Sequence, residues 1–180
     1  MISMTVIFWM FVFTFALVGM MRGWAAELLI SFSVILALAL IAVIENLLPI
    51  VGDALRANPA MDYIVRMSIV LFIVFFGYQS PKFSRIAKAV DKRDRLSDSI
   101  LGFIMGAVSG YMVYGTFWSF ANSASYPFIK DMVIPPSPQT PGGQAALWLL
   151  EWMPPMWLGE QPMIYIAVVL AFVFVIVVFI

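Results

Sequence analysis

The chain contains neither cysteine nor histidine among its 180 residues. Without cysteine it has no disulfide, no thiolate metal ligand and no cysteine nucleophile. Without histidine it lacks the side chain that most often acts as a general base or binds a transition metal. We therefore expect a protein that is not an enzyme and that has no cofactor or metal site.

Charged side chains are also scarce. They make up 11% of the residues, whereas 63% are hydrophobic, and the mean hydropathy is +1.01. A soluble domain typically carries about 25% charged residues, so this chain has too little polar surface to stay folded in water. The formal net charge is zero, which leaves no broad basic field for nucleic acid. The composition indicates an integral membrane protein.

Five apolar segments are candidates to cross a bilayer, whose hydrocarbon core of about 30 Å requires roughly 20 helical residues. They cover residues 4–21, 25–50, 63–80, 99–120 and 163–180, the third being short. The first has no basic residues before it and no small-residue cleavage site after it, so we interpret it as a retained span. The predicted fold is an all-α polytopic bundle with four spans in residues 1–120 and a fifth in residues 121–180.

The basic residues predict the orientation, because lysine and arginine accumulate in cytoplasmic loops. In a five-span arrangement, seven basic residues lie on one side of the membrane, namely Arg22, Lys82, Arg85, Lys88, Lys92, Arg93 and Arg95. The other side has only Arg56, Arg66 and Lys130. We predict an external N-terminus, a cytoplasmic C-terminus and a location in a bacterial inner membrane.

Residues 82–98 have the pattern of an amphipathic helix at the inner interface. Apolar side chains recur at helical spacing at Phe83, Ile86, Ala87 and Val90, and basic residues occupy mostly the other faces. One interpretation is a solvated connector with the usual cytoplasmic positive charge. The other is a surface for a partner or for anionic lipid, bound by Lys82, Arg85, Lys88 and Lys92.

The external connection before the fifth span is rich in proline, glycine and tryptophan. A short interfacial helix is predicted over residues 145–153, with tryptophans at Trp148, Trp152 and Trp157. Tryptophans next to a span usually lie at headgroup level and anchor the chain there. The alternative is a docking face for another subunit.

Two pairs of opposite charges lie near the ends of the predicted spans. Arg22 and Glu27 lie on either side of the turn between the first and second spans. Glu45, near the end of the second span, and Arg66, near the start of the third, could pair across the connection between those spans. Such pairs fix helix register more surely than they add stability. We expect a structural role for both pairs, with an ion or substrate role as the alternative.

The fourth predicted span has glycines at Gly102, Gly106 and Gly110, with Gly115 slightly further on. Residues spaced four apart lie near one helical face, where missing side chains let another backbone approach closely. The spacing predicts a packing groove. It leaves open whether the groove holds another helix of this chain or a partner.

Two segments together resemble a known family of bacterial inner-membrane proteins. The first, residues 19–27, reads GMMRGWAAE and contains Gly19, Arg22, Gly23 and Glu27. The second begins with Asp98, continues through Leu101 to Gly102, and leads into the glycine-spaced span. The pair is similar to the Arg-Gly motif and the Asp-Arg-x-Leu-Gly motif of the colicin V production protein (CvpA) family.

The resemblance covers residues 1–120 and implies a divergent member with an extra C-terminal span. Ser99 stands where the family usually has arginine, which puts any role of that arginine in doubt. The family implies a non-enzymatic protein linked to toxin production or export and to envelope homeostasis. It implies no substrate and no reaction.

We therefore expect a scaffold or accessory subunit that assembles with itself or with other membrane subunits. A small channel or transporter is the alternative. The hydroxyl-bearing residues of such a channel would be Ser31, Ser33, Ser68, Ser109 and Tyr114.

Overall fold

The computed structural model describes residues 2–179 apart from 49–51, 54, 56 and 80–94. Its main elements are the helices α1 (Met4–Arg22), α2 (Trp24–Leu47), α4 (Pro59–Gln79), α6 (Arg95–Ser123), α7 (Pro141–Glu151), α8 (Pro154–Leu158) and α9 (Met163–Phe179). The all-α fold expected from the sequence is confirmed.

Four helices, α1, α2, α4 and α6, are each long and apolar enough to cross a membrane. A fifth crossing is formed if α7–α8 and α9 count as one span, and these two parts meet at a bend of 70°. Helix α9 alone has 17 residues and no charged side chain, which at 1.5 Å per residue gives a length of about 25 Å. The chain is a multi-pass membrane protein.

The third predicted span is longer than expected. We predicted residues 63–80, but α4 begins at Pro59 and has 21 residues. A proline in the first turn needs no intrahelical hydrogen bond from its own nitrogen, so it starts a helix readily. The Asn58 side chain accepts a hydrogen bond from the Met61 backbone nitrogen at 3.3 Å, which caps this start.

The two predicted interfacial helices have different outcomes. The last residues of the segment 82–98 belong to α6, which begins at Arg95 instead of Ser99, while residues 82–94 lie outside the described part of the chain. The lipid contacts predicted for that segment remain predictions. On the other side, α7 begins at Pro141, four residues earlier than predicted, because Thr140 accepts a hydrogen bond from the Gly143 nitrogen at 3.1 Å and caps the helix.

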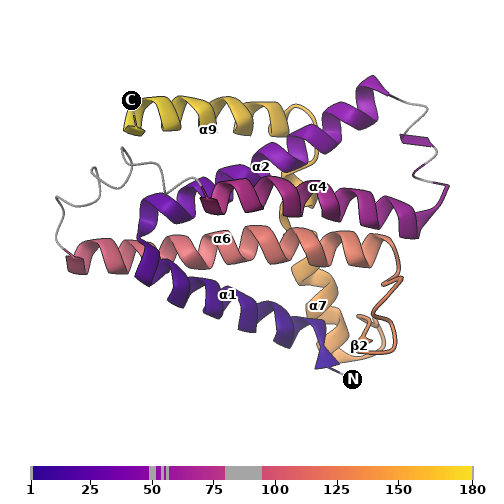
Figure 1. The fold of residues 1–180 in the computed structure, drawn as a ribbon. Coiled ribbons are helices and arrows are strands. Elements are labelled where there is room, and N and C mark those ends of the chain that lie inside the picture. Colours follow the sequence, from indigo (N-terminus) through magenta and orange to yellow (C-terminus); the bar gives the residue numbers. More distant parts are fainter. Residues whose placement is uncertain (1, 49–51, 54, 56, 80–94, 180) are drawn as a thin grey trace.

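Helices α1 and α6 lie side by side and antiparallel, with α2, α4 and α9 forming the other half of the bundle (Figure 1). One apolar core joins α2, α4, α6 and α9 around Ile30, Val34 and Val70. A second core joins α1, α6 and α7 around Phe8, Trp118 and Met153. The two cores meet along α6, which is the central helix.

A short parallel sheet ties the N-terminus to the connection between α6 and α7. Strand β1 (Ile2–Ser3) pairs with β2 (Val133–Ile134), a contact that the sequence did not predict. The N-terminus therefore lies at the α6–α7 end of the bundle, and the C-terminal end of α9 lies at the opposite end, which also holds the turn between α1 and α2 (Figure 1). This arrangement is the one expected for an odd number of crossings.

The predicted anchors lie on α7 and α8 or just after α7. Trp148, Trp152 and Trp157 are all exposed, and the first two rings lie 6.2 Å apart. Helix α7 runs across the direction of the long helices (Figure 1). Tyr111 of α6 donates a hydrogen bond to the Trp152 carbonyl and accepts one from Trp157 Nε1 at 3.2 Å, which holds the junction of α7 and α8 on the bundle.

We predict that a reporter fused to the C-terminus reports the cytoplasm and that one fused to the N-terminus reports the outside. The reason is the excess of basic residues at the α1–α2 and α4–α6 connections. Paired fusions to an enzyme active only in the cytoplasm and to one active only outside it measure both ends. Two termini on the same side would contradict the odd number of crossings.

Candidate functional site: the joint between α1, α2 and α6

Helices α1, α2 and α6 meet around Arg22, Gly23, Glu27, Asp98 and Ser109, a contact that we call the joint. The carboxylate of Glu27 lies at its centre. Glu27 lies in the first turn of α2 and is fully buried. Arg22 Nη1 donates to its Oε1 at 3.1 Å, and the Ser109 hydroxyl of α6 donates to its Oε2 at 2.5 Å. The predicted pair of Arg22 and Glu27 is confirmed. Both carboxylate oxygens have a partner, which compensates the removal of this charge from water.

Arg22 also connects the joint to α4. Its Nη2 donates to the Tyr78 carbonyl at 3.2 Å, and its guanidinium carbon lies 4.2 Å from the centre of the Tyr78 ring. Tyr78 is in the last turn of α4, where the helix dipole favours a positive charge. One side chain from α1 therefore holds the start of α2 and the end of α4 together.

Gly23 alone separates α1 from α2. Its backbone has φ 86° and ψ 158°, a conformation that is essentially restricted to glycine. A side chain here would also have no space, since a Cβ would lie 2.7 Å from Asp98 Oδ2. Backbone conformation and packing both require glycine at this turn.

Asp98, in the first turn of α6, lies against the N-terminal end of α2. The positive end of the α2 dipole favours a carboxylate at this position. Its Oδ1 is buried and has no hydrogen-bond partner within the part of the chain that the structure describes. The geometry thus gives Asp98 a position beside the Gly23 turn and not a partner in the Arg22–Glu27 pair.

The glycine groove of α6 is filled by α1 of the same chain. A Cβ on Gly102 would overlap the carbonyl oxygen of Gly19, and a Cβ on Gly106 would lie 3.0 Å from the Cα atoms of Ala16 and Gly19. On Gly110 it would lie 2.7 Å from Phe15 Cβ. The sequence left the occupant of the groove open; it is an internal helix.

Two residues assigned to these motifs lie away from the groove. A Cβ on Gly115 would face α8 and its preceding residue, with Met153 Sδ at 2.8 Å and Pro154 Cδ at 3.0 Å. Gly115 is thus a packing glycine, but for the external segment and not for α1. Leu101 is exposed on the outer face of α6.

The structure brings the two motif segments into one place, although about 80 residues separate them. Gly19 meets Gly102, Gly23 meets Asp98, and Glu27 meets Ser109. Ser109 was not predicted as a partner, although it lies three residues after Gly106 and so near the groove face. No sequence signal pointed to Tyr78, because its contact depends on where α4 ends.

The second predicted ion pair is also confirmed. Arg66 Nη2 lies 2.9 Å from Glu45 Oε1, so the pair joins α2 to α4. Arg66 Nε also donates to Asp62 Oδ1 at 2.8 Å, one turn earlier on α4. This third member was missed, although it has the usual i, i+4 spacing of a helical salt bridge. All three side chains are about a quarter exposed or less.

The joint has the chemistry of a structural contact, which we call the lock: the buried Glu27 carboxylate bonded to Arg22 and to Ser109. Glu27 has both oxygens engaged and no access to solvent. No group of three or more acidic, histidine or cysteine residues able to hold a metal occurs in the described ranges of the chain. The arrangement holds α1, α2 and α6 together and ties α4 to them through Arg22.

We predict that Arg22→Met lowers the free energy of unfolding by about 3–5 kcal/mol, because it leaves the buried Glu27 charge unpaired. Arg66→Met is the matched control and should cost about 1 kcal/mol or less, since Glu45 and Asp62 are about a quarter exposed or less, whereas Glu27 is fully buried. The double variant Arg22→Met/Glu27→Gln should recover much of the loss. Thermal unfolding in mild detergent measures all three, and equal losses for the two arginines would contradict the lock.

We further predict that Gly102→Ala destabilises the bundle by about 1–3 kcal/mol, the usual range for overpacking. The new methyl group would meet the Gly19 backbone, which has no side chain to move away. Gly142→Ala is the control, since nothing lies within 4 Å of a Cβ at that position. The same unfolding assay compares them, and an unchanged transition for Gly102→Ala would show that α1 and α6 are further apart.

No protein-family model matches this chain, and neither a curated protein nor a solved structure has significant similarity to it.

Proposed function

We propose that the chain is a non-enzymatic scaffold or accessory subunit of a membrane assembly in a bacterial inner membrane. The resemblance of its motifs to the CvpA family suggests a role in toxin production or export, or in envelope homeostasis. Support comes from the contrast between the closely packed joint and α4, a lightly covered helix. The middle of α4 carries a hydroxyl that has no hydrogen-bond partner among the described residues.

The locked core provides the rigid part of such a scaffold. Gly19, Gly102 and Gly106 bring the α1 and α6 backbones into contact. The bonds from Arg22 and Ser109 to Glu27 then fix α2 against both helices. Both motif segments of the family resemblance are used in this joint, which is why they are not free to bind a partner.

Helix α4 offers the lateral surface. Only 17% of the residues in its most apolar window are buried, against 50% for α2. Its outer face exposes large apolar side chains at helical spacing, namely Ile64, Leu71, Phe72 and Phe75. Such a face suits either lipid or another helix, so its apolar residues alone do not favour a partner.

The exposed hydroxyl of Ser68 is the feature of α4 that favours a partner. This serine is the tenth of the 21 residues of α4 and is exposed on the same face as Ile64 and Phe72. Its hydroxyl makes no hydrogen bond to another residue of the described chain, whereas Thr14, exposed on α1, donates to the Met10 carbonyl at 2.8 Å. A hydroxyl facing hydrocarbon is costly unless it is paired, and serine commonly pairs across helices.

The residues of the alternative channel do not share one face. Ser31 is buried and donates to the Glu27 carbonyl at 3.3 Å, and Ser109 donates to the Glu27 side chain. The Tyr114 ring stacks on Phe11 at 4.6 Å, between α1 and α6. A lumen within one chain would require these groups to point into a common space. A pore formed between several copies along α4 is the remaining form of this alternative.

We predict that Ser68→Ala weakens association about 3- to 20-fold, the effect of losing about 0.6–1.7 kcal/mol of interhelical hydrogen bonding. Thr14→Val is the matched control, since it removes an exposed hydroxyl that is already paired within its own helix. Purification in mild detergent with native mass spectrometry measures the bound chains.

A stoichiometric complex that Ser68→Ala disrupts and Thr14→Val preserves would support the scaffold. A chain that is monomeric in both variants and that gives substrate-dependent flux in liposomes would contradict it and favour the transporter.

A further inference from the structure

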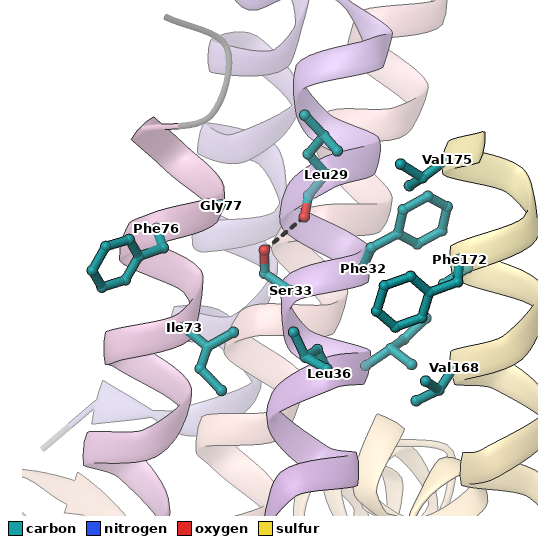
Figure 2. A pocket seen from close by; sticks show the side chains of 12 residues that line it. Leu29, Phe32, Ser33, Leu36, Ile73, Phe76, Gly77, Val168, Phe172 and Val175 are labelled. Carbon is teal, nitrogen blue, oxygen red and sulfur yellow. Dashed lines mark hydrogen bonds between the residues drawn. The ribbon is translucent and has the colours of Figure 1, made fainter. Parts of the chain in front are cut away.

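A lateral cavity separates α4 from α9. Both helices pack against α2, but on different sides of it, and a space of about 270 Å³ remains between them (Figure 2). Leu29, Phe32, Ser33 and Leu36 of α2 form its floor. The walls come from α4 and α9 and comprise Ile73, Phe76, Gly77, Val168, Phe172 and Val175. Phe76 and Phe172 are both more than half exposed, so the cavity opens toward the surroundings of the bundle.

The lining offers no free polar side chain. Ser33 is its one side chain with an oxygen, and its hydroxyl donates to the Leu29 carbonyl at 2.7 Å (Figure 2). That bond leaves the serine satisfied within its own helix. A ligand with hydrogen-bonding or charged groups would lose its own hydration here and gain nothing in return. The lining therefore suits a hydrocarbon better than a polar ligand.

The walls also do not suit a helix. Helices associate in lipid through small residues that allow close backbone approach and through hydrogen bonds between side chains. The walls instead carry bulky residues such as Phe76 and Phe172. Gly77 does not offer a close approach either, because the Ser33 Cβ would lie 2.9 Å from a Cβ on that glycine. A helix of a partner or of a second copy would find neither kind of contact.

The dimensions suit a single chain of a lipid. The floor runs along α2 from Leu29 to Leu36, a separation of seven residue positions or about 10 Å. This length fits within the roughly 15 Å of one hydrocarbon leaflet. The volume lies just below the roughly 300–1,000 Å³ of pockets that enclose drug-sized molecules. Leu29 is only two residues beyond Glu27, so the cavity lies in the half of the membrane next to the α1–α2 turn.

We propose that the cavity between α2, α4 and α9 binds one acyl chain of a membrane lipid, inserted from the leaflet next to the α1–α2 turn. Association between apolar side chains and lipid has no hydrophobic driving force within a bilayer. The preference for this site over the bulk lipid comes from packing, because a chain in the cavity restores contacts that the gap between α4 and α9 leaves unmade.

Native mass spectrometry of the full chain, purified in mild detergent and washed, tests the proposal. We expect one retained diacyl lipid per chain. Ala171→Phe places a ring in the cavity and should lower the retained fraction about tenfold or more, since overpacking of this size is costly. Val173→Phe is the matched control, because Val173 is half exposed on the same helix and does not line the cavity. Equal retention in both variants would overturn the proposal.

A second measurement keeps the test independent of how the variants fold. Unaltered protein in vesicles is irradiated with a phospholipid that carries a diazirine within its acyl chain, and labelled peptides are identified. Preferential labelling of residues 168–175 and 73–77 over the exposed residues 9–11 of α1 is expected. Labelling of all three in proportion to exposure, or protection of the first two, would overturn the acyl-chain site.

Discussion

The contact between the backbones of α1 and α6 is the constraint on which the rest of the bundle depends. Gly19 opposes Gly102 and Gly106 with no side chain between them. Because these two helices touch, the turn at Gly23 reaches the start of α6, and Glu27 comes within bonding distance of Ser109. The burial of the carboxylate and the position of α2 both follow from this close approach.

The helices of this bundle differ in how they are held, and the difference follows from the solvent. Lipid chains solvate an apolar side chain about as favourably as a neighbouring helix does. Contacts between helices in a bilayer therefore depend on close packing and on hydrogen bonds or ion pairs. The contact of α1 with α6 and α2 uses both devices, and α4 is tied by Arg22 and Arg66. Helix α9, almost purely apolar, packs on α2 through side chains such as Phe32 and Phe174 alone, and it is the helix that leaves a gap.

The sequence was sufficient for the features that depend on local pattern. Hydropathy located the long helices, and the spacing of the glycines and of the two ion pairs identified residues that do make contacts. It was insufficient where the outcome depends on how helices are rotated against each other. Ser109 and Tyr78 reach the joint from α6 and α4, more than 50 residues from Arg22, and no local pattern records that meeting.

The errors in helix ends have a different cause. Pro59 and Pro141 were interpreted as loop residues, but each occupies the first turn of a helix, where a missing N–H is harmless. The pairing of β1 with β2 involves two residues in each strand, too few to produce an alternating pattern. The helix starts that were predicted too late and the strand pairing that was not predicted all lie in short segments, at the α6–α7 end of the bundle and at the start of α4.

The turn at Gly23 also constrains the order in which the protein is made. Because only one residue separates them, α1 and α2 form a tight helical hairpin, and we expect the two helices to insert into the bilayer together. At that moment Arg22 and Glu27 have only each other, because Ser109 and the glycines of α6 are synthesised some 80 residues later. Until α6 is made, the ion pair leaves the hairpin without a net charge at this turn. Once α6 packs against α1, Ser109 adds its hydrogen bond to Glu27 and completes the joint.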